Sequence, residues 1–277
     1  MSRTEKIIPL IQKRSIEALL ESGKRIDGRA VGDYRAVKVS TDIIERAEGS
    51  ALVEIGNTMV IAGVKMALGT PYPDTPDKGA LIVNAELIPI ASPTFEPGPP
   101  GEDDIEISRV VDRGIRSSEM IDLSKLAVIE GRRVWIVYVD IYALNHDGNL
   151  IDACMLAAVA ALLTAQKPKT EVNGDEVVVL EEREPLPVKD RPVSVTFAKI
   201  GHHVLVDPCY REELAMDSRL TLSFSENGNI VAVQKGLSGY FTYEEVLDSI
   251  ERGQKIANKI REKLPSIPKF EEKSSKE

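Results

Sequence analysis

Residues 149–166 (NLIDACMLAAVAALLTAQ) are apolar on nearly every side when they are placed on a helix. A helix on the surface of a globular protein keeps one polar face, whereas a helix without a polar face has to be surrounded by other elements. We therefore expect this helix to lie in the core of the fold. Asp147 or Asn149 would cap its N-terminus, since both residue types accept hydrogen bonds from free helix N–H groups.

Around this helix, the sequence twice shows the same order of strands followed by a helix. The first half contains strand-like runs at residues 50–68, 80–90 and 132–144. The second half contains four expected strands, at residues 193–201, 203–207, 220–226 and 229–236. A closing helix begins at Thr242 with a capping box. This order predicts an α+β fold of two lobes with a weak internal duplication.

These patterns divide the chain into segments of different character. The connection between the lobes is rich in Lys, Glu and Pro and contains one small hairpin at Asn173-Gly174. The C-terminal tail is charged and poor in apolar residues, which is typical of disorder. The expected segments are an N-terminal helix and loop (1–30), a first lobe (31–168), the connection (169–191), a second lobe (192–265) and a disordered tail (266–277).

Composition excludes several classes of protein. The two cysteines, Cys154 and Cys209, belong to no CxxC pair, which argues against a disulfide framework and a zinc cluster. No apolar run reaches the length of a membrane span, and the start is too polar for a secretory signal. We expect a cytoplasmic protein with no membrane association. Because the net charge is −9, contact with nucleic acid requires a local basic stripe or a basic partner.

Residues 104–120 contain such a stripe on an expected helix. At about 100° per residue, four apolar residues fall on one side: Ile107, Val110, Val111 and Ile115. Three arginines fall within about a 60° arc on the opposite side: Arg109, Arg113 and Arg116. Arginine keeps its charge and binds phosphate bidentately, so this face suits successive phosphates. The alternative is a solvated face paired with Glu106, Asp112 and Glu119, and helix geometry alone favours that alternative.

Two further stretches follow strands. Residues 145–152 (NHDGNLID) lead into the core helix, whose free N–H groups favour an anion. No Ser, Thr, Lys or Arg follows Gly148 directly, so a plain helix cap is favoured there. Residues 207–213 (DPCYREE) hold paired acids that could bind a metal or act as acid and base. Such runs are common in turns, and their spacing alone favours a turn with solvated acids.

Five segments, taken in order, resemble the RNase PH fold (ribosomal protein S5 domain 2-like) of phosphorolytic 3′→5′ exoribonucleases. The resemblance extends over about residues 25–263, and the order and spacing of the segments are more specific than any one of them. The segments are residues 25–29 (RIDGR), 47–50 (AEGS) and 107–116 (ISRVVDRGIR), the strand and helix around Asp147-Gly148, and Asp207 through Asn227-Gly228.

The resemblance implies an activity in which inorganic phosphate attacks the 3′-terminal phosphodiester of RNA and releases nucleoside diphosphates. Active members hold the phosphate with a Gly-Ser/Thr-Arg triplet at the N-terminus of the central helix. Here Gly148-Asn149-Leu150 stands in that place, without the hydroxyl or the arginine. Active members also carry two aspartates six residues apart. Here Asp207 matches the first, and Glu213 replaces the second.

A further family arginine is replaced near Ala91. Loss of one preorganised group of this kind typically costs on the order of 10²–10³ in rate, so the departures together predict a chain that is inactive alone. The pattern resembles the non-catalytic RNase PH-type subunits of exosomes, most of all the archaeal ones. We therefore expect neither a catalytic residue nor a metal ligand in this chain.

That resemblance implies a hexameric ring, a trimer of heterodimers with a catalytic sister subunit. RNA-binding cap proteins would cover one face, and single-stranded RNA would enter the channel. The complex would use inorganic phosphate, with a need for Mg²⁺ left open, and this chain would hold no cofactor. Family members carry arginines on this helix near the RNA path, which favours RNA contact at Arg109, Arg113 and Arg116.

Two alternatives to this interpretation stay open on the sequence. In the first, the chain is an active phosphate-dependent 3′→5′ exoribonuclease that uses Asp207 and Glu213. In the second, the chain is a purely structural ring component that never touches RNA, and its arginines pair with acids at a subunit interface.

Overall fold

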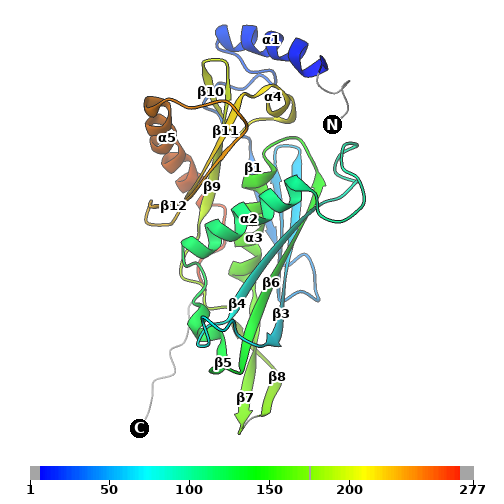
Figure 1. The fold of residues 1–277 in the computed structure, drawn as a ribbon, viewed down its shortest axis with the longest axis vertical. Helices are drawn as coiled ribbons and strands as arrows, with labels where there is room; N and C mark the ends of the chain where they lie inside the picture. Colours follow the sequence, from blue (N-terminus) through cyan, green and yellow to red (C-terminus); the bar gives the residue numbers. More distant parts are fainter. Residues whose placement is uncertain (1–6, 175, 269–277) are drawn as a thin grey trace.

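A six-stranded mixed sheet forms the first lobe of the computed structural model, which describes residues 7–174 and 176–268 (Figure 1). Its path is β1-β2-β3-β6-β4, and β5 pairs with the start of β6. All pairings in this sheet are antiparallel except that of β4 with β6. The strands are β1 (Val37–Thr41), β2 (Gly49–Ile55), β3 (Thr58–Gly69), β4 (Ala80–Leu87), β5 (Ala127–Ile129) and β6 (Arg133–Asn145).

Two parallel neighbours cannot be joined by a tight turn, so the chain between β4 and β6 has to cross over the sheet. This crossover carries α2 (Glu102–Ser117) and the 3-10 helix η1 (Leu123–Leu126). Helix α2 packs against β4, α3 and β12, and it therefore lies where the two lobes meet.

The second lobe is a four-stranded antiparallel sheet in the order β10-β9-β11-β12. Helix α5 (Tyr243–Arg261) packs on β9 and β11, and α1 (Ile7–Glu21) packs on the short helix α4 (Tyr210–Ala215). The predicted capping box of α5 is confirmed, since Thr242 Oγ1 accepts from Glu245 N (3.2 Å) and Thr242 N donates to Glu245 Oε2 (2.7 Å). The strands are β9 (Val193–Ile200), β10 (His203–Val206), β11 (Ser218–Phe224) and β12 (Ile230–Gly236).

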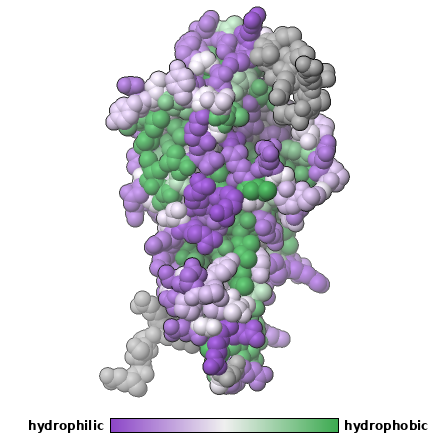
Figure 2. Space-filling model, viewed as in Figure 1, coloured by the Kyte–Doolittle hydropathy of each residue, from purple (hydrophilic) through white to green (hydrophobic). Residues whose placement is uncertain are grey.

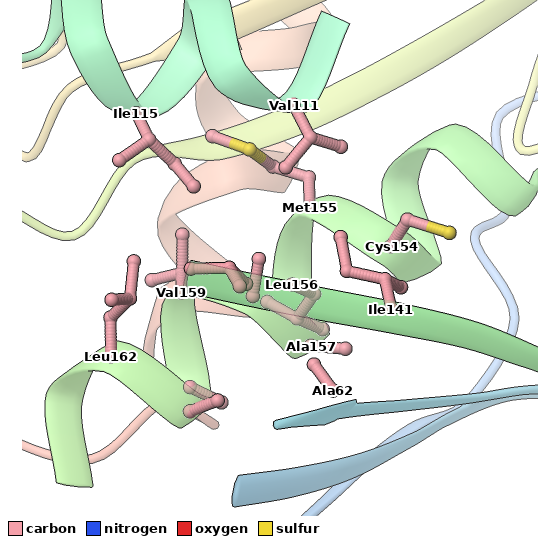
Figure 3. Close-up of a cluster of buried hydrophobic side chains, with 14 of the residues drawn as sticks. Ala62, Val111, Ile115, Ile141, Cys154, Met155, Leu156, Ala157, Val159 and Leu162 are labelled. Atoms are coloured by element: carbon pink, nitrogen blue, oxygen red, sulfur yellow. The ribbon is translucent and has the colours of Figure 1, made fainter. Parts of the chain in front are cut away.

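Helix α3 (Leu150–Thr164) packs on β2 and β3 of the first sheet and on β9 of the second. All its residues from Leu150 to Leu163 are buried, which confirms the prediction that this apolar helix lies in the core. Figure 3 shows Met155 of α3 beside Val111 of α2. Gly49 is required where β2 crosses α3, because a Cβ atom there would lie 2.3 Å from the Ala161 carbonyl oxygen.

The connection between the lobes forms a hairpin of β7 (Gln166–Asn173) and β8 (Glu176–Pro185), which projects at one end of the molecule in Figure 1. The hairpin is longer than the small one expected at Asn173-Gly174. Strands followed by a helix in each lobe confirm the α+β fold class. The predicted disorder of the tail concerns residues that lie largely outside the described ones.

Candidate functional site

Helix α2 carries the three arginines that the sequence places on one face. Its four apolar residues named above are buried, and Gly101 N at its start donates to the Asp104 carboxylate (2.9 Å). The arginines on the opposite side are all exposed: Arg109, Arg113 and Arg116. Figure 2 shows hydrophilic residues gathered over α2 in the middle of the face drawn in Figure 1. The predicted division of this helix into an apolar and a basic face is confirmed.

Arg116 is the arginine of this face that an acidic neighbour holds. Its Nη2 lies 2.6 Å from Asp112 Oδ1, one turn earlier on the same helix. The same nitrogen donates to the Leu81 carbonyl oxygen at 3.1 Å. The guanidinium is thereby fixed beside β4 while its side chain stays 47% exposed, so it can still meet a ligand.

The other two arginines are less engaged. Arg113 Nη1 donates to the Gln234 side-chain oxygen at 3.2 Å. Glu106, which could have neutralised the basic face, instead pairs with Arg219 at 2.6 Å. Among the described residues, neither Arg109 nor Arg113 forms an ion pair. The interpretation as a self-paired solvated face therefore fits Arg116 and does not fit Arg109 or Arg113.

The N-terminus of α3 is closed by a carboxyl group from a distant part of the chain. Asn149 is its N-cap residue, but the Asn149 side chain makes no cap hydrogen bond, and Asn149 N donates to Glu213 Oε1 at 2.7 Å. Gly148 has φ of 85°, and a Cβ atom there would lie 2.5 Å from the Cys209 carbonyl carbon. Asn149 thus occupies the N-cap position that the sequence predicts, but the expected side-chain hydrogen bond to the helix does not form, and Glu213 from α4 accepts from the Asn149 backbone.

The Asn149 side chain instead joins two buried aspartates. Its Nδ2 donates to Asp207 Oδ1 (2.7 Å) and to Asp152 Oδ2 (2.8 Å). Asp152 also accepts from Tyr34 Oη (2.9 Å) and from Thr196 N (2.9 Å) and Oγ1 (2.7 Å). Burial raises the pKa of Asp152 to about 7, although the donors from Asn149 and Thr196 oppose that rise.

Asp207 is fully buried and is held by two arginines. Arg35 reaches both carboxylate oxygens, with Nε 2.8 Å from Oδ2 and Nη2 2.7 Å from Oδ1. Arg29 Nη1 adds a third contact, 2.8 Å from Oδ2. Burial would raise the pKa of Asp207, but the hydrogen bonds and charge of Arg35 outweigh it and lower the pKa below its ordinary value. The Asp207 carboxylate is therefore ionised and already fully engaged.

Glu212 is also fully buried, and it accepts two hydrogen bonds from Arg25, one of them Nε to Oε1 at 2.8 Å. Arg25 further donates to the carbonyl oxygens of Val206 and Asp207, at 2.8 Å each. The prediction of solvated acids at residues 207–213 is therefore wrong for Asp207 and Glu212. A buried carboxylate without a partner is costly, and the arginines of residues 25–35 remove that cost.

The role of these arginines was not predicted from the sequence, where residues 25–29 stood out only as a segment of the family resemblance. Arg25, Arg29 and Arg35 lie in one short segment and all turn inward to the acids after β10. The available signal was the presence of three arginines in residues 25–35 and of three acids in residues 207–213. Side chains 172 or more residues apart cannot be paired from spacing alone.

One group of side chains has the composition of a metal site. The ligand atoms of Asp27, Cys209 and Glu212 lie within 4.8 Å of one another. Arg25 already binds Glu212, and Arg29 Nε lies 2.7 Å from Asp27 Oδ2. Burial, with the nearby Glu212 charge, raises the pKa of Cys209 to about 11, so its thiol keeps its proton at neutral pH. These residues do not fit a divalent cation.

Glu213 and His146 line a cavity of about 120 Å³ between α2, α3 and β11. Burial raises the pKa of Glu213 to about 7 and lowers the pKa of His146 to about 4, so His146 is neutral at pH 7. The His146 ring stacks on Phe95 at 5.3 Å between centroids, and its Nε2 lies 3.9 Å from Glu213 Oε2. The Arg219–Glu106 pair also lines this cavity, so α2 and the start of α3 border the same space.

We predict that Glu213→Gln changes how stability depends on pH. The folded-state pKa of Glu213 is raised, so its neutral form stabilises the fold below about pH 4.5 and this contribution is lost as pH rises through about 7. Glutamine mimics the neutral acid and can still accept from Asn149 N. The variant should match the wild type near pH 5 and be more stable at pH 8, on the order of 2 kcal/mol.

Urea unfolding of both proteins at several pH values between 5 and 8 measures this difference. Asp152 titrates in the same range in both proteins, so only the difference between them reports on Glu213. Parallel stability curves for the variant and the wild type would contradict the assignment.

Within the part of the chain that the structure describes, each helix is too short or too polar to span a bilayer.

The 3′ exoribonuclease family model for domain 1 (RNase_PH) matches residues 33–168, and the model for domain 2 (RNase_PH_C) matches residues 190–256. The Exosome complex component Rrp42 of Methanopyrus kandleri is 51% identical over 256 residues, which are 92% of this chain and 96% of that protein. The protein of the same name from Pyrococcus horikoshii is 52% identical over 257 residues, 92% of this chain and 94% of its own length.

Solved structures agree with the sequence relatives. A chain of the Archaeoglobus fulgidus exosome with RNA bound to the active site is 46% identical, with a TM-score of 0.85 over 93% of this chain and 99% of that chain. A chain of an archaeal exosome core is 44% identical, with a TM-score of 0.82 over 94% of this chain and 98% of its own. With two matching domains and relatives that are alike over almost their full length, the chain belongs to the RNase PH family of 3′ exoribonucleases.

Proposed function

We propose that this chain is a non-catalytic ring subunit of an exosome that degrades and processes RNA from the 3′ end with inorganic phosphate. In this role it contributes to RNA binding and supports a catalytic sister subunit. Relatives about half identical to it over most of their length carry the name of an exosome component, and one similar solved complex holds RNA. Two features of this chain bear on its part in that complex: the N-terminus of α3 and the exposed face of α2.

The observation that carries the proposal is the state of the α3 N-terminus. Asn149 N, which stands where active members would hold phosphate, donates to the Glu213 carboxyl group at 2.7 Å. Leu150 follows in place of an arginine, so no side chain of the triplet supplies positive charge. Asp207, the remaining acid of the family pair, is bound by Arg29 and Arg35. A phosphate or a metal would have to displace internal partners here, which supports a chain that is inactive alone.

The exposed face of α2 supports the RNA-binding part of the proposal. A helix rises about 1.5 Å per residue, so Arg109 and Arg113 are about 6 Å apart along the axis and Arg116 continues the line. Among the described residues, no acidic side chain pairs with Arg109 or Arg113, so both guanidiniums are available to a ligand. Phosphate contacts by such guanidiniums give affinity without sequence preference.

Membership of the same family supports a proposal about the partners of this chain. We propose that the chain alternates with its catalytic sister subunit in a trimer of heterodimers, with RNA-binding cap proteins on one face. Single-stranded RNA would pass along the arginine face, and the complex would work in the cytoplasm. Inorganic phosphate would act in the sister subunit, and this chain would hold no cofactor.

Phosphorolysis of a 3′-tailed RNA by the pure chain and by the chain mixed with its catalytic sister subunit tests the first half of the proposal. We expect nucleoside diphosphates from the mixture in the presence of inorganic phosphate. The pure chain should give at most about one part in a hundred of that rate, because several phosphate-binding groups are missing. Comparable release by the pure chain would establish the alternative in which Asp207 and Glu213 suffice.

Charge reversal on α2 tests the second half. Arg113→Glu with Arg116→Glu should weaken binding of single-stranded RNA to the assembled complex by tenfold or more at low salt, where phosphate contacts are strongest. Both side chains are exposed, so the complex should still assemble. Binding is measured by fluorescence anisotropy without phosphate, so that the RNA stays intact.

The matched control reverses two exposed cations on other elements, Arg14 of α1 and Lys38 of β1. This control should bind RNA like the wild type. Unchanged RNA binding by the α2 variant would reject RNA contact on this face. Loss of ring assembly by the α2 variant would favour the purely structural alternative.

A further inference from the structure

A cavity of about 310 Å³ opens at the C-terminal end of α2, between the start of β4 and the segment that contains η1. Three cationic side chains from three separate segments line it: Lys78, Arg116 and Lys189. The buried residues Leu81 and Ile115 contribute apolar wall. Small-molecule sites commonly have a volume of at least about 300 Å³ and combine apolar wall with convergent polar groups. In this cavity the apolar wall stands beside both cationic and acidic side chains.

The three cations differ in how far the protein neutralises them. Lys189 Nζ lies 2.9 Å from Asp122 Oδ2, and Asp122 also accepts from Ser124 Oγ at 2.6 Å. Arg116 is balanced by Asp112, which stands outside the cavity lining. Lys78 is exposed and forms no ion pair within residues 7–174 and 176–268. Lys78 is therefore the cation of this lining whose charge has no acidic partner among those residues.

The lining selects a class of ligand. An inorganic anion would gain nothing from Leu81 and Ile115, and it would meet the carboxylates of Glu119 and Asp122. A nucleotide could satisfy all of these groups. The flat face of its base would contact Leu81 and Ile115, and donors of its ribose and base would bind the carboxylates. Its phosphate would bind the lysines. Single-stranded RNA is recognised through such unstacked units.

Arg116 joins this cavity to the arginine face, since it is both the last arginine of that face and part of the lining. An RNA strand that follows Arg109, Arg113 and Arg116 is thus led to the cavity mouth. We infer that the cavity receives one nucleotide of this strand and that Lys78 and Lys189 contact its phosphates. The inference rests on the proposed RNA-binding function and extends it to two residues outside α2.

The test measures binding of fluorescein-labelled oligoadenylate RNA to the assembled complex, without inorganic phosphate, over a series of salt concentrations. Lys78→Ala and Lys189→Ala should each weaken binding about three- to tenfold. Each should also lower the slope of log affinity against log salt by about 0.7, the value for one phosphate contact on a single strand. Asp122→Asn breaks the pair with Lys189 but leaves the Lys189 charge. This variant should bind RNA at least as well as the wild type if Lys189 contacts a phosphate, and it should bind as weakly as Lys189→Ala if only the pair matters.

Lys38→Ala is the matched control, because Lys38 is an exposed lysine on β1, paired with Glu54 at 2.8 Å. It should leave both affinity and salt slope unchanged. An unchanged slope in Lys78→Ala and Lys189→Ala, while Arg113→Glu with Arg116→Glu still weakens binding, would overturn the cavity assignment alone. Unchanged binding in all these variants would reject the RNA-binding function itself.

Cross-linking gives a second test of the cavity. RNA carrying 4-thiouridine should cross-link to residues 78–81 or 119–124, and cross-links confined to other segments would count against the cavity.

Discussion

The ion pair between Asp207 and Arg35 is the interaction on which the middle of this molecule depends. A carboxylate with no exposed surface is strongly unfavourable unless hydrogen-bonded cations surround it. Arg35 comes from the segment before the first sheet, Asp207 follows a strand of the second sheet, and Asn149 from the start of the core helix binds the same carboxylate. One charge therefore ties both lobes and α3 together. The ion pair of Arg25 with Glu212 links the segment before the first sheet to the second lobe a second time.

This arrangement explains how a chain of an exoribonuclease family can be a supporting subunit. The groups that would serve a reacting phosphate in an active member here have partners within the chain, since Glu213 accepts from Asn149 N and Asp207 is bound by two arginines. The exposed positive charge lies instead on the outer face of α2. In the proposed function, this chain binds RNA through the face of α2 and leaves the chemistry to its sister subunit, while the core of the fold is retained.

Local patterns predicted a large part of the fold. The burial of α3 follows from its apolar circumference, and the box at Thr242 and the two faces of α2 follow from spacings within a few residues. The centre of the candidate site could not be predicted in this way. Arg25 and Glu212 are 187 residues apart, and each alone resembles an ordinary surface charge. The acids at 207–213 were therefore expected in solvent. Asn149 was correctly expected at the N-cap of α3, but the contact of its backbone N–H with Glu213 could not be foreseen.

The most direct test of this account is whether the pure chain binds inorganic phosphate. Thermal unfolding is followed with increasing phosphate, against chloride at the same ionic strength. Because a ligand of the folded state raises the unfolding temperature by mass action, a free phosphate site would appear as a saturable rise. The account predicts no such rise, since the Glu213 carboxyl group already accepts from Asn149 N. A saturable, phosphate-specific rise that disappears when a bulky side chain replaces Asn149 would contradict it.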